Sequence, residues 1–301
     1  MTAHLQACPA GASARLPTAS ARRPTASPAE LQRIGRAAVA ALHDELALEP
    51  KPGLVSFVDS GSHHDMDART FMRSLFALRH SFPRLAALGA AGADFDALER
   101  EGRAAESRML HATAGINTHR GAIFSLGLLC ASAGALIAEG AALQPAALRR
   151  TLIVRWGERL VQRAPQSRTS HGAAAARSLG LIGANAEAAR GFPVLFETTL
   201  PALRAALARG ALPRQARLDA LFQTIAVLDD TTLAHRGGLA GLRYAQRAAR
   251  DWLRGGGANQ PDGLEHARSL HRAFVERRLS PGGAADLLAA ACWAQRVCTP
   301  P

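Results

Sequence analysis

Residues 121–138 read GAIFSLGLLCASAGALIA, a run without a single charged side chain. A stretch this long and apolar is either a membrane span or a helix buried in a large core. The run contains several glycines and serines, and no second run of this kind follows, which favours the buried helix. We therefore expect this segment to be the central helix of the fold, and we expect no membrane-spanning segment.

The sequence on both sides of this run is rich in alanine and leucine and repeats a helical pattern. It shows no alternation typical of hairpins and no strand–helix–strand rhythm. Helices are expected at 28–48, 68–81, 94–113, 145–163, 193–209, 218–228, 238–253, 264–278 and 281–296. No break in composition divides these segments. The sequence predicts an all-α fold: one multi-helix globular domain over residues 29–298, with active-site loops between the helices.

Residues 1–28 are rich in Ala, Ser, Pro, Thr and Arg and contain no acidic residue. They lack the apolar core of a secretory signal, so we expect a disordered leader. A transit peptide and a mis-set start codon are the alternatives. The cysteines Cys8, Cys130, Cys292 and Cys298 form no C-x-x-C pair. This usage indicates a reducing compartment without a disulfide framework, and we expect a cytoplasmic protein.

The chain carries 36 basic and 24 acidic residues, a formal net charge of +12. Such a balance suits an anionic partner. The arginines are scattered singly and aromatic residues make up only 5%, so the stacking platforms of nucleic-acid binders are missing. We therefore expect a phosphate-bearing small molecule rather than nucleic acid.

Lys51 is the only lysine among these basic residues, and it lies between Pro50 and Pro52. Lysine carries a rotatable point charge, whereas the guanidinium of arginine is planar. A lysine at this position could follow a flexible phosphate chain. The alternative is a chance placement.

The loop that contains Lys51 also holds a cluster of polar residues. They are Asp59, Ser60, His63, His64, Asp65 and Asp67. Asp65 and Asp67 are close enough in sequence to share a Mg²⁺ ion through water. His64-Asp65 could instead be the metal-binding pair of an HD-type phosphohydrolase. The simplest alternative is that Asp67 caps the next helix and the loop is solvated.

A second polar loop, ATAGINTHRG (residues 112–121), precedes the apolar run. Its hydrogen-bonding residues are Asn117, Thr118, His119 and Arg120. Arg120 can bind a phosphate with two nitrogens. Glu106, on the preceding helix, lies two turns before the loop and can point the same way. The alternative is a loop that only caps two helices.

Two further loops carry charge or unusual glycines. LDDTTLAHRGG (residues 228–238) contains Asp229, Asp230 and Arg236. Two adjacent carboxylates repel, so burying both needs a cation or a shared proton. In SPGGAADLLAA (residues 280–290), Ser280 is expected to cap a helix that begins at Pro281. Gly282 and Gly283 weaken a helix start, but they suit a backbone that approaches an anion closely.

Taken together, these stretches resemble the triphosphoribosyl-dephospho-CoA synthase family. The matching motifs, in order, are PKPGLVSFVDSGSHHDMD (50–67), Phe71 with Ser74, ATAGINTHRGAIFSLG (112–127), HG and GFP (171–193), DDTTLAHRGG (229–238) and SPGGAADLLA (280–289). The resemblance extends from about Glu30 to Trp293. PKPGLV, NTHRGAIF and SPGGAADLLA are its most specific parts.

The resemblance implies an all-helical, Mg²⁺-using transferase. Its substrates are ATP and 3′-dephospho-CoA, and its products are adenine and 2′-(5″-triphosphoribosyl)-3′-dephospho-CoA. That product goes on to a carrier-protein transferase, for the prosthetic group of malonate decarboxylase or citrate lyase. A homodimer is left open.

Roles for individual residues follow as expectations. Mg²⁺ on Asp65, Asp67 or Asp230, together with Lys51 and Arg120, would hold the triphosphate. Glu106 or Asp229 would accept the hydroxyl proton, and His64 or His119 would protonate the departing adenine. The remaining substrate-binding candidates are Ser60, His63, Asn117, Thr118, Arg236, Ser280, Gly282 and Gly283.

The sequence departs from the family pattern in three places. Residues 183–188 read GANAEA where GARGEA is expected, Thr232 replaces an asparagine, and Arg120 replaces a lysine. The first change removes an arginine and a glycine and puts the role of the 171–193 stretch in question.

Two other functions are compatible with the same residues. One is an HD-like, metal-dependent nucleotide phosphohydrolase built on His64-Asp65 and Asp229-Asp230. The other is a non-catalytic helical binding module for an acidic carrier protein or RNA. The clustering of polar residues in loops disfavours the module.

Overall fold

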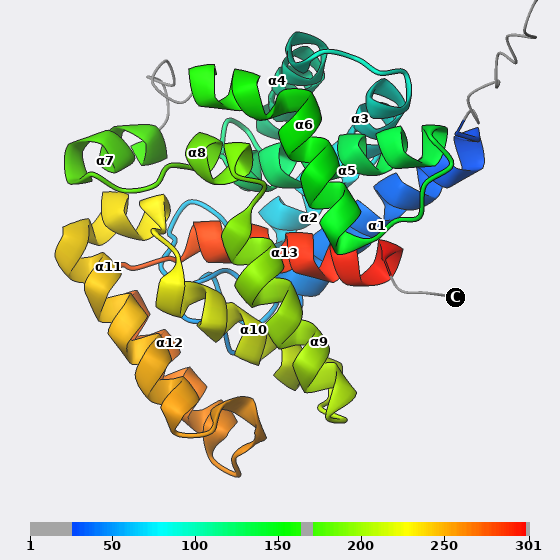
Figure 1. Ribbon diagram of the computed structural model, residues 1–301. Helices are drawn as coiled ribbons and strands as arrows, with labels where there is room; N and C mark the ends of the chain where they lie inside the picture. Colours follow the sequence, from blue (N-terminus) through cyan, green and yellow to red (C-terminus); the bar gives the residue numbers. More distant parts are fainter. Residues whose placement is uncertain (1–25, 164–170, 299–301) are drawn as a thin grey trace, which may run out of the picture.

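The computed structural model describes residues 26–163 and 171–298 of the chain (Figure 1). Within these residues all regular structure is helical and no strand is present, which confirms the all-α prediction. The elements are α1 (Pro28–Leu46), α2 (Ala68–Leu78), α3 (Ser81–Ala90), α4 (Phe95–Ala112), α5 (Arg120–Ala138), α6 (Pro145–Arg163), α7 (His171–Leu179), α8 (Ala184–Ala189), η1 (Leu195–Thr199, a π-helical turn), α9 (Leu200–Ala208), α10 (Pro213–Val227), α11 (Thr231–Arg254), η2 (Gly257–Asn259), α12 (Gly263–Glu276) and α13 (Gly282–Val297).

The apolar run forms α5, the core helix that the sequence predicts. It is long and apolar enough to cross a membrane, but 78% of its most apolar window is buried in this fold. Two glycines allow α5 to approach α3 backbone to backbone. A Cβ atom at Gly134 would lie 1.9 Å from the carbonyl oxygen of Ala86, and one at Gly89 would lie 1.9 Å from that of Ala131. Alanine at either position would force the two helices apart.

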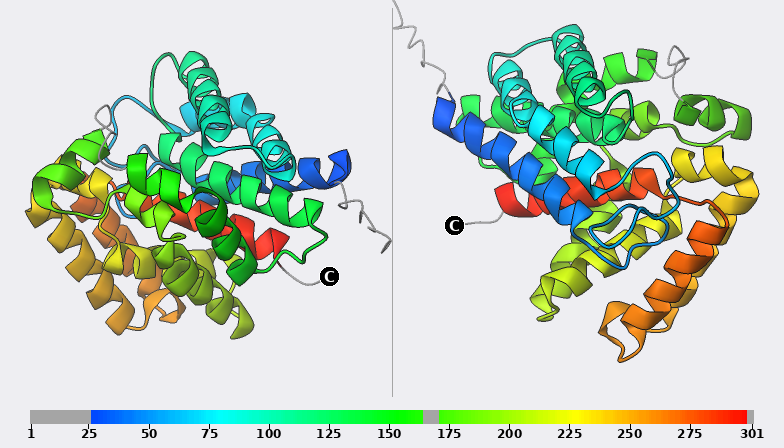
Figure 2. Two further views of the ribbon diagram at one scale, coloured as in Figure 1. Left: turned by 45° about the horizontal axis from the view of Figure 1, so that its top comes forward. Right: turned by 180° about the vertical axis from the view of Figure 1, so that it is seen from behind.

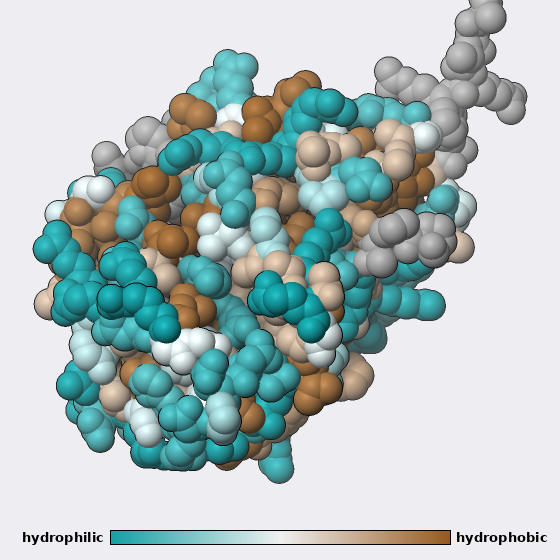
Figure 3. Space-filling view, turned by 60° about the horizontal axis from the view of Figure 1, so that its bottom comes forward, coloured by the Kyte–Doolittle hydropathy of each residue, from teal (hydrophilic) through white to brown (hydrophobic). Residues whose placement is uncertain are grey.

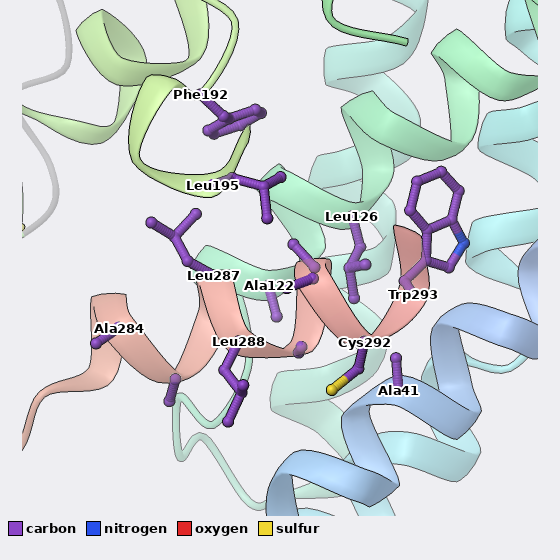
Figure 4. Packing of buried hydrophobic residues seen from close by; sticks show 14 of the residues in the cluster. Ala41, Ala122, Leu126, Phe192, Leu195, Ala284, Leu287, Leu288, Cys292 and Trp293 are labelled. Carbon is purple, nitrogen blue, oxygen red and sulfur yellow. The ribbon is translucent and has the colours of Figure 1, made fainter. Parts of the chain in front are cut away.

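The last helix of the described residues, α13, lies in the middle of the molecule. It runs between α1 and α5, with side chains such as Leu288 and Trp293 among the buried residues of its neighbours (Figure 4). Trp293 is fully buried, and its indole N–H donates to the carbonyl oxygen of Ile34 on α1, at 3.2 Å. The core is therefore closed by residues from both ends of the described chain.

Several helix starts are set by the capping residues expected from the sequence. Ser27 and Glu30 form a capping box at α1, with Pro28 in the first turn. Asp67 accepts from the backbone of Thr70 at 2.8 Å, and Asp94 accepts from that of Ala97 at 2.8 Å. Residues 1–25, most of the expected leader, lie outside the described residues, and Pro28 already belongs to α1.

Other boundaries differ from the prediction. α3 was not predicted. One helix was expected over residues 68–81, and the next was expected only at residue 94. α10 begins five residues early, at Pro213, and α11 begins at Thr231 rather than at Gly238. Gly238 has φ +62°, so it breaks α11 into two straight parts. Ser280 caps no helix: α13 begins at Gly282, because the Ser280 hydroxyl is engaged with His63 instead.

The long loop between α1 and α2 is held against the α12–α13 connection. The Ser62 hydroxyl donates to the carbonyl oxygen of Leu279 at 2.6 Å, and the His271 ring lies 2.8 Å from the carbonyl oxygen of Lys51. In the right panel of Figure 2 this loop crosses beside the start of α13. Hydrophilic residues cover most of the lower part of the surface in Figure 3, as expected for a strongly charged chain.

Candidate active site

A cleft of about 1330 Å³ opens between the helices. One wall is apolar and comes from α3, α4 and α5: Leu85, Phe95, Leu98, Ile123, Phe124 and Leu128. The opposite wall is polar and comes from the starts of α8, α11 and α13. The cleft exceeds the 300–1,000 Å³ usual for a single drug-sized ligand, so it has room for two large substrates.

Ten of the seventeen predicted site residues line this cleft. They are Glu106, His119, His63, Asn117, Thr118, Arg120, Arg236, Ser280, Gly282 and Gly283. The other seven do not line it. They are Lys51, Ser60, His64, Asp65, Asp67, Asp229 and Asp230. The structure thus brings residues of the loops 112–121, 228–238 and 280–290 together with His63 and leaves all three predicted metal ligands outside the cleft.

His119 is buried at the start of α5, and its two ring nitrogens differ. Nδ1 lies 2.7 Å from the hydroxyl of Ser74 on α2, while Nε2 has no hydrogen-bond partner. The ring lies edge-on to Phe71, with centroids 4.8 Å apart. Burial, and then the charge of Lys51, lowers the pKa of His119 to about 3, so the imidazole is neutral. An unpartnered buried nitrogen in a cleft is suited to a hydrogen bond with substrate.

Arg120 and Glu106 form an ion pair inside the cleft. The Arg120 Nε lies 2.5 Å from Glu106 Oε1, and a terminal guanidinium nitrogen also contacts that oxygen. Asn117 has a local role as well, since its side-chain oxygen accepts from the backbone N–H of Arg120 at 3.1 Å. The Glu106 side chain is therefore held in place beside the Arg120 guanidinium.

His63, Ser280 and Arg236 form a hydrogen-bonded chain on the polar wall. His63 Nε2 lies 3.0 Å from Ser280 Oγ, and His63 Nδ1 lies 3.0 Å from a guanidinium nitrogen of Arg236. Arginine can only donate, so Nδ1 accepts and Nε2 carries the proton that it donates to Ser280. Burial, and then the charge of Arg236, lowers the pKa of His63 to about 4. This arrangement fixes the tautomer of His63.

Lys51 lies behind the cleft, contrary to the expectation that it contacts phosphate. Its side chain is 1% exposed. Nζ lies 2.5 Å from Glu45 Oε1 and donates to the Glu45 carbonyl oxygen at 2.6 Å. Burial lowers the pKa of Lys51, and the charge of Glu45 opposes that shift. A guanidinium has five N–H groups to satisfy and needs more room, which explains a lysine in an arginine-rich chain.

Asp230 is not placed as a metal ligand. It is 1% exposed, and both of its carboxylate oxygens accept backbone hydrogen bonds. One accepts from Thr232 at 2.9 Å and Leu233 at 3.2 Å, and the other accepts from Ala284 at 2.9 Å. A Cβ at Gly283 would lie 3.2 Å from this carboxylate, so Gly283 lies against the anion of Asp230, whereas Gly282 lies against Thr232. One carboxylate thereby caps α11 and α13 together.

The remaining predicted ligands do not complete a metal site. Asp65 is exposed and lies 3.8 Å from His63, and Asp67 is exposed and uses one oxygen to cap α2. Within residues 26–163 and 171–298, no three His, Cys, Asp or Glu side chains gather in a way that could hold a metal ion. The set Asp65, Asp67 and Asp230 therefore does not fit Mg²⁺.

The HD-like arrangement is not assembled either. His64 is exposed outside the cleft, and Asp229 accepts from the backbone N–H of Ile182 at 3.2 Å. Ser60, half-buried in the same loop as His64, uses its carbonyl oxygen to accept from the backbone of His63 at 3.1 Å. The HD-like hypothesis requires His64-Asp65 and Asp229-Asp230 to meet at one site. Asp229 and Asp230 instead accept backbone hydrogen bonds, and His64 and Asp65 are exposed.

Sequence reasoning missed three acidic residues that line the cleft, namely Glu45, Glu99 and Asp286. Glu45 lies in the last turn of α1, where its charge looks like any surface residue until Lys51 folds back onto it. Asp286 lies one turn into α13 and faces Gly121, where an added Cβ would come within 2.0 Å of its Oδ2. The spacing between Gly283 and Asp286 gave a signal only for a helix start.

The altered 183–188 stretch also reaches the cleft. Gly183, Ala184, Asn185 and Ala186 line it, whereas Glu187 is buried behind them. Glu187 accepts from the backbone N–H of Val194 at 2.8 Å, and burial raises its pKa. The retained glutamate therefore holds the turn into η1, while the position of the missing arginine faces the cleft.

A large, partly apolar cleft with a few convergent polar groups is typical of an active or binding site. Residues 31–300 match the family described as ATP:dephospho-CoA triphosphoribosyl transferase. The chain belongs to that family, which confirms the resemblance and makes the protein a transferase.

A curated relative supports the same assignment. The Citrobacter koseri protein named "Probable 2-(5''-triphosphoribosyl)-3'-dephosphocoenzyme-A synthase" is 40% identical over 257 residues. The match covers 82% of this chain and 85% of the relative. No solved structure matches the chain.

Proposed function

We propose that the protein transfers the triphosphoribosyl group of ATP to the 2′-hydroxyl of 3′-dephospho-CoA and releases adenine. The observation that carries the proposal is the cleft, which has room for two nucleotides and combines an apolar wall with charged residues. Five arginines line it: Arg103, Arg120, Arg163, Arg177 and Arg236. Their charge suits two polyanionic substrates.

The two walls suggest where the substrates lie. The apolar wall of α3, α4 and α5 suits adenine and the pantetheine arm, since both bury apolar surface. Arg120 and Arg236 line the cleft and would bind the phosphate groups of the substrates. Lys51 does not contact either substrate in this proposal, because its ammonium group is paired with Glu45.

The reaction breaks the bond from C1′ of the ATP ribose to adenine and forms a bond from the same carbon to the attacking oxygen. The transition state should have oxocarbenium character, as in glycoside hydrolysis. Glu106 is the predicted base that lies in the cleft, and its pairing with Arg120 orients its carboxyl group there. The unpartnered His119 Nε2 is available to hold a substrate group, but a neutral imidazole with a pKa of about 3 is a poor source of the proton for adenine.

The remaining expectations are proposals as well. We propose that Mg²⁺ enters with the triphosphate as part of the substrate, since Mg²⁺ often binds through substrate phosphates and only one or two carboxylates. We propose a cytoplasmic enzyme whose product serves a carrier-protein transferase, with malonate decarboxylase favoured over citrate lyase.

The test is a mass-spectrometric assay of the purified protein with ATP, 3′-dephospho-CoA and Mg²⁺. The expected result is adenine together with a triphosphoribosylated dephospho-CoA, formed only when both substrates are present. Phosphate or pyrophosphate release from ATP alone would instead support the nucleotide phosphohydrolase. Absence of both reactions would overturn the proposal.

A further inference from the structure

Three of the four carboxyl groups that line the cleft in the described residues are ion-paired. Glu45 pairs with Lys51, Glu106 with Arg120, and Glu99 with Arg103 and Arg163. The fourth, Asp286, forms no salt bridge within that part of the chain. It is half-buried at the floor of the cleft, one turn into α13.

The groups around Asp286 are mostly negative or already neutralised. Glu45 faces it from α1, and Asp230 faces it from the start of α11. The backbone N–H of Ala122 on α5 donates to it, but Lys51 is committed to Glu45, and Arg120 is committed to Glu106. Burial, then Glu45, then Asp230 raise the pKa of Asp286 well above its ordinary value, against the effect of the Ala122 N–H. This environment favours the protonated form of the Asp286 carboxyl group, which lines the cleft.

We propose that Asp286 is a catalytic residue whose carboxyl group donates a proton to the departing adenine. This inference rests on the proposed transferase function and supplies the proton donor that His119 cannot provide. As the C1′–N9 bond breaks, its electron pair moves into the adenine ring. The Asp286 proton passes to a ring nitrogen, and a carboxylate remains. Glu106 takes the proton of the attacking hydroxyl, and exchange with water restores both groups between turnovers.

Gly121 leaves space for the carboxyl group of Asp286. An added Cβ at Gly121 would lie 2.0 Å from Asp286 Oδ2, closer than any non-bonded contact allows. The glycine in the NTHRGAIF stretch therefore lets α5 pass directly over the carboxyl group. Gly121→Ala would displace the acid while leaving its chemistry intact.

The test compares Asp286→Asn with the unchanged protein in the adenine-release assay. Asparagine has the same shape and no proton to give, so kcat should fall by about 10²–10⁴-fold, with KM for both substrates nearly unchanged. Asp219→Asn is the matched control. Asp219 is also a partly buried aspartate with a raised pKa, but it accepts from Ala258 beside η2, away from the cleft. Its variant should keep full activity.

A second substrate separates proton donation from other roles. N7-methyl-ATP carries a fixed positive charge on the purine, so its base leaves neutral without being protonated. With this substrate the Asp286→Asn defect should shrink to a few-fold. A defect of equal size with both substrates, or one relieved by raising Mg²⁺, would overturn the assignment as proton donor.

The outcomes also separate this inference from the proposed function. If the unchanged protein makes no triphosphoribosylated product, the function itself fails. If it makes the product and Asp286→Asn does so at the same rate, only the role of Asp286 fails. Gly121→Ala should lower kcat in parallel with Asp286→Asn, and full activity in Gly121→Ala would count against the geometry.

Discussion

The Lys51 ammonium and the Glu45 carboxylate form a buried ion pair, 2.5 Å apart, in which Glu45 lines the cleft and Lys51 lies behind it. Removing one member of such a pair leaves an uncompensated charge in the interior. Lys51→Met should therefore lower the free energy of unfolding by about 3–5 kcal/mol, measured by urea denaturation. Arg254→Met, which removes an exposed pair with Asp251, should change stability little.

Lys51→Arg tests the shape of the same site. The guanidinium does not fit a space that leaves 1% of the lysine exposed, so Glu45 and the cleft floor should move. We expect turnover to fall at least several-fold together with a loss of stability. Normal kinetics and an unchanged urea midpoint would show that the pocket accepts either cation.

Glu106→Gln should lower kcat by about 10²–10⁴-fold, because the base that accepts the hydroxyl proton is lost while the side-chain volume is kept. Glu101→Gln is the matched control, since Glu101 pairs with Arg108 on the same helix and does not line the cleft. A variant at Glu106 that keeps the full rate would remove this residue from the mechanism.

Acid should destabilise the protein through His63 and His119. Their pKa values in the folded state are lowered to about 4 and about 3, below the ordinary value. Between those values and about pH 6.5 the unfolded chain binds protons that the folded protein does not. Stability is therefore complete above about pH 6.5 and falls with decreasing pH, by up to about 1.4 kcal/mol per pH unit for each histidine.

Urea unfolding from pH 7.5 to pH 4.5 measures this loss. His119→Gln should make the dependence shallower, whereas replacing the exposed His266 with Gln should leave it unchanged. A slope that is the same in all three proteins would mean that neither burial nor the fixed contacts keep these rings neutral.

Asn185→Arg should strengthen substrate binding, because it restores the positive charge expected of the family at a position that lines the cleft. We expect KM for ATP or for dephospho-CoA to fall several-fold, with little effect on kcat. Asn259→Arg adds the same side chain at an exposed site on η2 and controls for net charge. Equal effects of the two substitutions would point to general attraction rather than to a specific contact.

The fold could be predicted from local sequence because several helices begin at capping residues or at proline. Asp67 and Asp94 are cap-forming residues at the starts of predicted helices, and the uncharged run of α5 favours a buried helix. α3 was missed because it follows α2 after a two-residue turn, with no glycine or proline before Ser81 to mark the break. Local sequence does not show that Gly238 interrupts α11, since a single glycine is also tolerated within a helix.

The site was predicted where its residues are adjacent in sequence and missed where they meet only in space. Asn117, Thr118, His119 and Arg120 reach the cleft as a group. Asp230 looked like a metal ligand because nothing in the sequence reveals that the backbone of Ala284, more than fifty residues later, donates to it. Glu45 and Asp286 lie even further apart along the chain, so their proximity carries no sequence signal.

The central position of α13 bears on how the protein is made. Ribosomes release a chain from its N-terminal end, and domains generally fold as units. All other described helices leave the ribosome before α13, yet α1 and α5 pack against it, and it supplies Asp286 and Gly283. The apolar surfaces of α1 and α5 that pack against α13 therefore stay uncovered until residues 282–297 emerge. A chain stalled before that point would lack the helix that packs against α1 and α5, and its cleft would lack Gly283 and Asp286.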